Sequence, residues 1–174
     1  MNTRRRTFAI TFCAMLAALS LILLLAASFL PSGRLALAAV AGFLPAAAVL
    51  SAGGLRAGLA CYIVTAALAL LLLPDKFAAL AYVILFGHYA VVKSLLERIS
   101  QPVLIWVCKL VLCNLLFALL IRLFGAVFLD NLPERLRMIP LLHLFGSIAF
   151  VIYDIVFSML IRFYQQRIGP HLRR

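Results

Sequence analysis

Two opposite charges, Lys109 and Asp154, interrupt stretches of sequence that are otherwise almost entirely apolar. A charged side chain at the centre of a membrane helix costs about 2.5–3.5 kcal/mol even on lenient insertion scales, so it persists only where it has a partner or a function. These two residues therefore constrain the fold more strongly than any others. Any arrangement of the apolar segments has to give both charges a suitable place.

The apolar segments define the class of protein. Hydrophobic residues make up 67% of the 174 residues and charged residues 12%, whereas soluble domains average about 45–50% apolar and 25% charged. A helix needs about 20 apolar residues to cross a hydrocarbon core of about 30 Å. The sequence predicts six such helices, at about 7–30, 35–52, 58–73, 77–96, 103–124 and 139–161.

None of these segments alternates polar and apolar residues with the period of two that a transmembrane β-barrel requires. No connection between them is long enough to fold as a separate soluble domain. The predicted fold is therefore all-α, an integral membrane bundle of six transmembrane helices that forms one domain over residues 1–174.

The distribution of charge predicts the orientation of the bundle. Six helices put both ends of the chain on one side, and that side would hold most of the basic residues: Arg4, Arg5, Arg6, Arg56, Lys93, Arg98, Arg162, Arg167, Arg173 and Arg174. The opposite side would hold Arg34, the neighbouring charges Asp75 and Lys76, and a mixed set between 122 and 137. Because positively charged loops stay in the cytoplasm, we expect both termini to be cytoplasmic, in a multi-pass protein of the inner (cytoplasmic) membrane of a bacterium.

Several functions have no support in the sequence. The net charge of +11 comes from cations scattered at the ends of helices, with no basic domain that could bind nucleic acid; contact with anionic membrane lipid explains them better. The four cysteines form no CxxC pair, so we expect packing residues and no metal site. The sequence holds no catalytic signature and no cofactor motif, so we do not expect an enzyme.

The two intramembrane charges are predicted to lie at the same level. Lys109 lies about seven residues after Pro102, on a helix that leaves the cytoplasm, and Asp154 lies about eight residues before Arg162, on the helix that returns. At about 1.5 Å per residue, both lie about 10 Å from the cytoplasmic ends of their helices. His88 on the fourth helix reaches a similar level. We interpret the set as an ion pair that locks the helices together or as a relay for protons or ions.

A second polar set lies in the predicted outer half of the bundle. On the sixth helix, His143, Ser147, Phe150 and Asp154 follow one narrow stripe, because their spacing of i, i+4, i+7 and i+11 matches the helical period. Tyr82, Asn114 and Arg122 could stand opposite this stripe. Aromatic side chains with a few converging polar groups are typical of small-molecule pockets. We therefore predict that Tyr82, Asn114, Arg122 and His143 bind a substrate, although interfacial anchoring and ordinary interhelical bonds are the alternative.

The first three helices are rich in small residues. Ala14 and Ala18 form an AxxxA step on the first helix, and a Gly/Ala-rich stretch, 50–58, joins the second helix to the third. Small residues let helix backbones approach closely in lipid. With its size and its six helices, the chain resembles the substrate-binding S components of energy-coupling factor transporters. The resemblance implies capture of a vitamin-like small molecule, and docking of the Ala14 and Ala18 face onto a transmembrane coupling subunit driven by ATPases.

Two other functions remain open at this stage. A membrane scaffold or assembly subunit, as in the cell-shape and wall machinery, would use the same small-residue faces to hold a partner and would transport nothing. A proton-coupled carrier would use Asp154 as its titrating group. A polar outer pocket separates the first of these from a binding subunit, because a scaffold does not need one.

Overall fold

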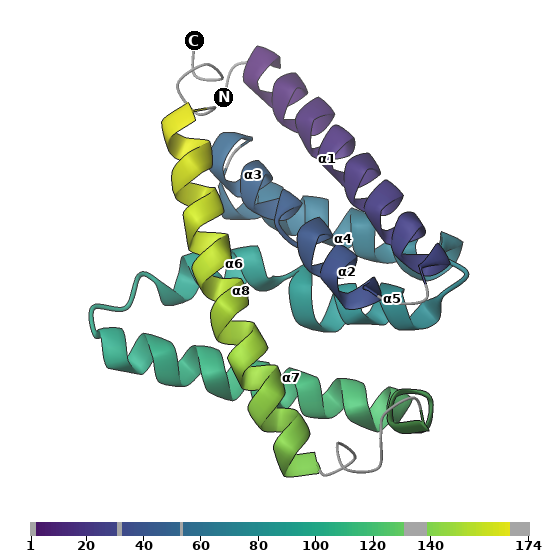
Figure 1. The fold of residues 1–174 in the computed structure, drawn as a ribbon. Coiled ribbons are helices and arrows are strands. Elements are labelled where there is room, and N and C mark those ends of the chain that lie inside the picture. Colours follow the sequence, from purple (N-terminus) through teal and green to yellow (C-terminus); the bar gives the residue numbers. More distant parts are fainter. Residues whose placement is uncertain (1–2, 31–32, 53, 131–138, 168–174) are drawn as a thin grey trace.

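The computed structural model describes the chain except for residues 1–2, 31–32, 53, 131–138 and 168–174, and every element that it assigns in the described residues is helical (Figure 1). The elements are α1 (Thr3–Phe29), α2 (Arg34–Ala41), α3 (Leu44–Ser51), α4 (Leu55–Leu72), α5 (Lys76–Ala81), a π-helical turn η1 (Tyr82–Phe86), α6 (Tyr89–Leu96), α7 (Pro102–Asp130) and α8 (Ile139–Arg167).

In the described part of the chain, six helical segments are long and apolar enough to cross a membrane. They are Arg6–Phe29, Arg34–Ser51, Leu55–Leu72, Lys76–Leu96, Pro102–Leu123 and Pro140–Arg167. The all-helical fold and the six apolar segments agree with the sequence prediction. The sixth helix continues to Arg167, beyond the predicted end at residue 161.

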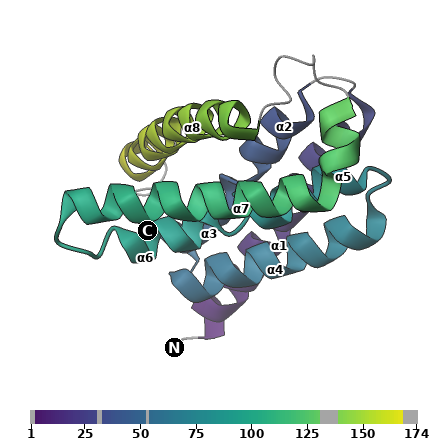
Figure 2. The same cartoon turned by 90° about the horizontal axis from the view of Figure 1, so that it is seen from below.

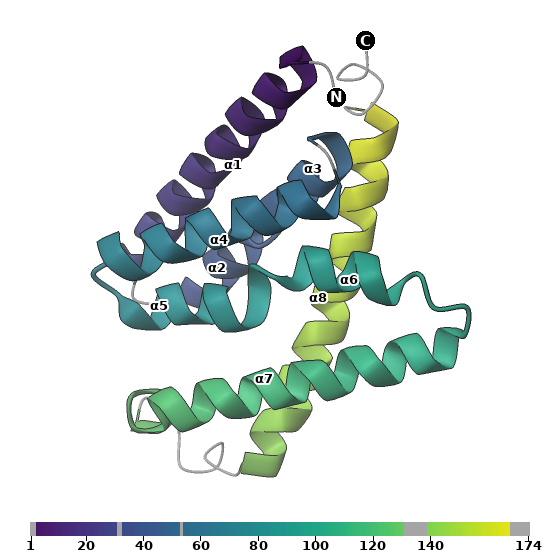
Figure 3. The ribbon, with the colours of Figure 1, turned by 180° about the vertical axis from the view of Figure 1, so that it is seen from behind.

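Helix α1 packs against α2, α3 and α4 (Figures 1 and 3). Small residues dominate this contact. Two buried clusters fill it, one containing Leu24, Ala38, Ala41, Ala66, Ala69, Leu73, Ala79 and Tyr82, and the other containing Leu16, Ala17, Ala48 and Cys61. Alanine side chains allow the helix axes to come close, which increases van der Waals contact between backbones. The first half of the chain is therefore the more tightly packed part.

Helices α7 and α8 contact each other in an antiparallel sense. Lys109 meets Asp154, Asn114 meets Ser147 and Phe117 meets His143, so residue numbers rise along α7 as they fall along α8. The two helices diverge beyond this stretch, and α8 crosses α7 steeply (Figures 1 and 2). Both helices present large exposed apolar side chains on their outer faces, among them Val103, Val111, Leu115, Ile152, Met159 and Phe163.

The second apolar segment is broken near its middle. α2 ends at Ala41 and α3 begins at Leu44, with Gly42 and Phe43 between them. Pro45 lies in the first turn of α3 and carries no N–H, so the carbonyl of Ala41 has no donor four residues later. Proline is tolerated at this place because the first N–H groups of a helix have no intrahelical partner.

The fourth apolar segment is broken as well, by the π-helical turn η1. The N–H of Gly87 donates to the carbonyl of Tyr82 at 2.7 Å, five residues earlier, so the carbonyl of Val83 loses that donor. The Tyr62 hydroxyl on α4 donates to the Val83 carbonyl at 3.0 Å. A Cβ at Gly87 would lie only 2.7 Å from the Tyr62 ring, so the turn needs glycine there.

The two breaks lie against each other. A Cβ at Gly42 would come within 2.8 Å of Phe86 Cβ and 2.9 Å of the Phe86 carbonyl oxygen. The hydroxyl of Tyr153 on α8 lies 3.0 Å from the same point. Helix breaks and π turns recur at functional sites, and here two of them meet beneath α8.

Candidate functional site

Asp154 is the centre of a buried charge cluster. It is 3% exposed, and its carboxylate accepts hydrogen bonds from Lys109 at 3.0 and 3.2 Å, one to each oxygen. The Tyr89 hydroxyl donates to Oδ1 at 2.5 Å, and Lys93 donates to the same oxygen. A buried carboxylate keeps its charge only when its lone pairs are satisfied by donors. Here three side chains from α6 and α7 supply them.

Two lysines share this one aspartate. Lys93 is 2% exposed and Lys109 is 4% exposed, and Lys93 also donates to the Ser158 hydroxyl at 2.9 Å. Glu97 supplies the second negative charge, with Oε1 at 2.9 Å from Lys93 Nζ and 3.6 Å from Lys109 Nζ. Its side chain is 48% exposed, so it closes the cluster from the rim.

Aromatic rings of α8 hold Tyr89 in position. Its ring meets the rings of Phe150, Tyr153 and Phe157 with centroids 5.3–5.5 Å apart. The contacts with Phe150 and Phe157 are edge-to-face, and contacts of this kind stabilise by about 0.5–1.5 kcal/mol each beyond area burial. The packing directs the hydroxyl of Tyr89 to Asp154.

The structure brings Lys109 and Asp154 together, as expected for two charges at one level, but it places His88 elsewhere. The His88 ring stands edge-on to Tyr62 on α4, at 6.0 Å between centroids. On this part of the chain, Tyr89 and Lys93 contact Asp154, and His88 does not belong to the cluster. The distribution of charge predicts Lys93 at the cytoplasmic end of its helix, whereas the structure buries its side chain. The spacing of Tyr89, Lys93 and Glu97 at i, i+4 and i+8 is the signal that could have identified this face.

A cavity of about 420 Å³ adjoins the cluster. Its walls come from α2, η1, α6, α7 and α8, and the residues that line it are mainly aliphatic and aromatic: Leu35, Ala36, Ala39, Leu85, Phe86, His88, Tyr89, Lys109, Leu112, Cys113, Leu116, Phe117, Leu142, Phe145, Gly146, Ala149, Phe150 and Tyr153. Its volume lies in the range of about 300–1,000 Å³ that is usual for small-molecule pockets. The π-helical turn η1 contributes Leu85 and Phe86 to one of its walls.

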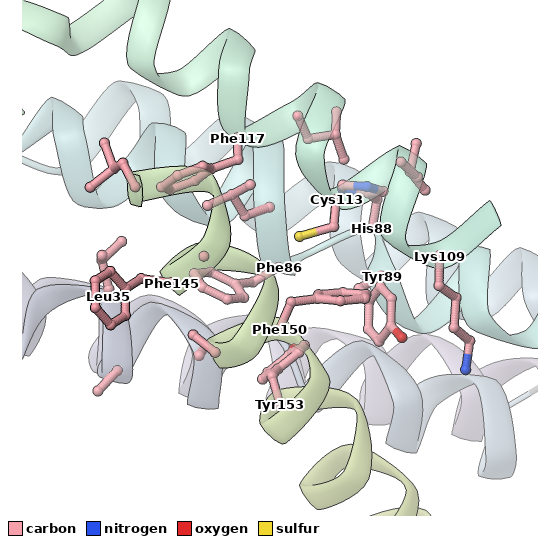
Figure 4. Close-up of a pocket in the computed structure, with 18 residues that line it drawn as sticks. Leu35, Phe86, His88, Tyr89, Lys109, Cys113, Phe117, Phe145, Phe150 and Tyr153 are labelled. Carbon is pink, nitrogen blue, oxygen red and sulfur yellow. The ribbon is translucent and has the colours of Figure 1, made fainter. Parts of the chain in front are cut away.

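The polar groups of the cavity are unevenly placed. Lys109 and Tyr89 lie at one end, and Leu35 and Phe145 lie at the other (Figure 4). The hydroxyl of Tyr153, another lining residue, is buried and has no hydrogen-bond partner among the described residues. The apolar walls offer no hydrogen bonds, so they suit the apolar body of a bound molecule. A polar group at one end of that molecule would lie beside Lys109 and Tyr89.

None of the four residues predicted to bind substrate lines this cavity. Tyr82 is fully buried in the core between α1, α2 and α4, and Arg122 is exposed. Asn114 donates to Ser147 at 3.0 Å, and the ring of His143 stands edge-on to Phe117. In the stripe on α8, Ser147 and His143 contact α7. Neither of them lines the cavity.

Ala14 and Ala18 lie on an exposed face of α1. Large apolar side chains surround them there, including Ile10, Met15 and Ile22. The face is therefore free in the isolated chain, on the side of α1 away from α2 and α4.

Within the described residues, no group of three or more His, Cys, Asp or Glu side chains is close enough to hold a metal ion. Comparison of the chain with protein-family models, with curated proteins and with solved structures gives no match. Functional assignment therefore depends on the cavity and the charge cluster.

Proposed function

We propose that the chain is a multi-pass membrane protein that binds a small molecule, as the substrate-binding subunit of an importer of the energy-coupling factor type. The cavity beside the buried charges is the observation that carries this proposal. It has the volume and the apolar and aromatic walls that are usual for small-molecule sites, together with a few polar side chains, among them Lys109 and Tyr89 at one end. A scaffold subunit would need no such space.

The apolar character of the exposed surface agrees with insertion in a membrane. The outer faces of α7 and α8 carry many large apolar side chains, such as Leu115 and Ile152, which would form an extensive apolar patch in water. The N-terminal end of α1 and the C-terminal end of α8 lie at the same end of the molecule (Figures 1 and 3). This arrangement supports both termini on one side, and the charge distribution favours the cytoplasmic side of the inner membrane.

The broken helices support a binding role in a second way. In many transport proteins, irregular backbone inside the membrane lines the substrate site, where protein or water can satisfy its polar groups. Here Tyr62 satisfies the freed carbonyl of Val83, and the break at Gly42 lies against Phe86. The cavity lining includes Phe86, in the π-helical turn, and Ala39, three residues before Gly42.

The exposed Ala14 and Ala18 face would contact the coupling subunit, and the driving ATPases would bind that subunit from the cytoplasm. By this proposal the chain itself performs no chemistry on its ligand. It would capture the molecule and release it through the larger complex.

The proposal is tested by purification from a bacterial membrane in mild detergent, followed by native mass spectrometry. We expect a small molecule bound at one copy per chain, and a coupling subunit with ATPases in the same complex. Recovery of cell-wall synthesis proteins with no bound ligand would instead support the scaffold. Uptake that requires a proton gradient and no ATPase would support the carrier.

A variant that fills the cavity gives a matched test. Ala39→Phe places a ring in the cavity wall, so the bound molecule should be lost. Ala60→Phe adds the same ring to an exposed position on α4, outside the cavity, and should keep it. Equal ligand occupancy in the two variants would exclude this cavity as the site.

A further inference from the structure

Lys109 belongs both to the charge cluster and to the lining of the cavity. The electrostatic balance of the cluster therefore decides what kind of polar group the cavity favours at that end. Trp106 is adjacent, with Lys109 Nζ 5.4 Å from its ring centroid, so an aromatic ring as well as a carboxylate contacts this ammonium group.

The fully buried part of the cluster carries one excess positive charge. Lys93 and Lys109 are both cationic, and among the described residues Asp154 is the one carboxylate buried with them. Glu97 restores neutrality from the rim, through a single oxygen that reaches both lysines. The positions of the two carboxylates are not equivalent, because Asp154 is enclosed by its three donors and Glu97 is half exposed.

Glu97 is the member of the charge cluster whose side chain can turn away from the two lysines. It caps the C-terminal end of α6, where the partial negative charge of the helix disfavours a carboxylate. Solvent can satisfy its oxygens as soon as it turns outward, and half-exposed ion pairs contribute little to stability. Withdrawal of Glu97 would leave the two lysines with one uncompensated positive charge beside the cavity.

The cavity walls determine what kind of apolar body the bound molecule would have. Six aromatic side chains line the cavity, namely Phe86, Tyr89, Phe117, Phe145, Phe150 and Tyr153. Rings of this kind pack well against a flat aromatic body, in offset or edge-to-face contacts. An apolar body with rings would therefore gain more from these walls than a sugar or a peptide would.

We infer that the cavity takes a small ring-bearing monocarboxylate, whose carboxylate replaces that of Glu97, a residue outside the cavity lining, as the second negative charge beside Lys109. The inference rests on the proposed binding function and names its ligand class. A single negative charge restores neutrality at the two lysines, whereas a doubly charged phosphate would exceed it.

The test uses the full chain in lipid nanodiscs and three compounds that share one body: biphenyl-4-carboxylate, biphenyl-4-methanol and biphenyl-4-yl phosphate. Binding is measured by equilibrium dialysis, with empty nanodiscs subtracted. We expect the carboxylate to bind about tenfold more tightly than the alcohol, because a hydrogen bond to a charged group adds that much affinity. The phosphate should bind less tightly than the carboxylate.

Two variants separate the charges. Glu97→Gln should tighten carboxylate binding severalfold and leave alcohol binding unchanged, because it removes the competing anion. Lys109→Met should abolish the preference for the carboxylate over the alcohol. Asp75→Asn is the control, since it removes one negative charge at the start of α5 and keeps an N-cap side chain that can accept from Phe77.

The outcomes distinguish the inference from the proposed function. Equal affinity for the carboxylate and the alcohol, or an unchanged ratio in Glu97→Gln, would overturn the ligand class and leave binding in the cavity intact. Tightest binding of the phosphate would also overturn it. Failure of all three compounds to bind would reject the ligand class as well, while the co-purification experiment would still decide whether the chain belongs to an importer.

Discussion

Asp154 differs from an ordinary buried ion-pair partner because three side chains on two helices depend on it. Lys109 approaches from α7, and Tyr89 and Lys93 approach from α6. Removing one partner of a buried pair costs about 3–5 kcal/mol, since the remaining charge is left uncompensated. The cost of substituting a member should therefore depend on how many charges it leaves behind.

We predict that Asp154→Asn destabilises the folded chain more than Lys109→Met does. The asparagine leaves two buried lysines with only Glu97 between them, and the expected loss is about 3–5 kcal/mol. The methionine leaves Lys93 and Asp154 paired. Thermal denaturation in detergent, with the two variants side by side, measures the difference.

Ser158→Ala serves as the control for this comparison, because it removes only a neutral hydroxyl that accepts from Lys93 at 2.9 Å. Its effect should be smaller than that of either charge substitution. Equal stability of Asp154→Asn and Lys109→Met would mean that the aspartate serves only one lysine.

Lys109 and Asp154 could be found from the sequence because a charge within an apolar stretch is conspicuous. Lys93 was harder to place, because a lysine in the last turn of a helix ordinarily extends to the aqueous boundary. His88 and Tyr82 could not be oriented, because their facing depends on the π-helical turn. Tyr82 begins that turn and packs into the α1 side of the bundle, away from α7 and α8.

Among the elements, the fourth segment departs most from a regular helix. A π turn inserts an extra residue, which rotates everything after it relative to a continuous α-helix. Tyr89 and Lys93 thereby face Asp154, and His88 faces Tyr62 and the cavity. The turn thus supports the cluster and the cavity together.

We predict that Gly87→Ala destabilises the turn by about 1–3 kcal/mol, the usual cost of overpacking. A Cβ there would lie 2.7 Å from the Tyr62 ring and 2.8 Å from the Tyr82 ring. Gly146→Ala is the matched control, because its Cβ would lie 3.1 Å from a Phe117 ring edge. Gly87→Ala should unfold at a lower temperature than Gly146→Ala. The reverse order would show that the rings beside Gly87 can move aside at little cost.

The six apolar segments were predictable as elements because length and composition suffice to identify them. The break at Gly42 had a visible cause in Pro45. The π turn had none, because no residue type requires one and Gly87 is needed only through rings that come from other parts of the chain. Tertiary contact therefore decided the feature that sequence reasoning missed.

For the whole molecule, the arrangement of helices predicts the sidedness of its ends. A fluorescent protein fused after Arg174 should fluoresce, because it folds in the cytoplasm. Alkaline phosphatase fused after Asp75, between α4 and α5, should be active, because that connection would lie outside. The opposite pattern in both fusions would invert the topology, and a mixed pattern would exclude six crossings.

The shared aspartate also has a consequence for biosynthesis. Chains emerge from the ribosome N-terminus first, so Lys93 and Lys109 would reach a membrane before Asp154 does. Until α8 arrives, the carboxylate that the described part of the chain holds beside the two ammonium groups is that of Glu97. The last helix therefore completes the electrical balance of the nascent bundle, and a chain that stops before it should be a substrate for membrane quality-control proteases.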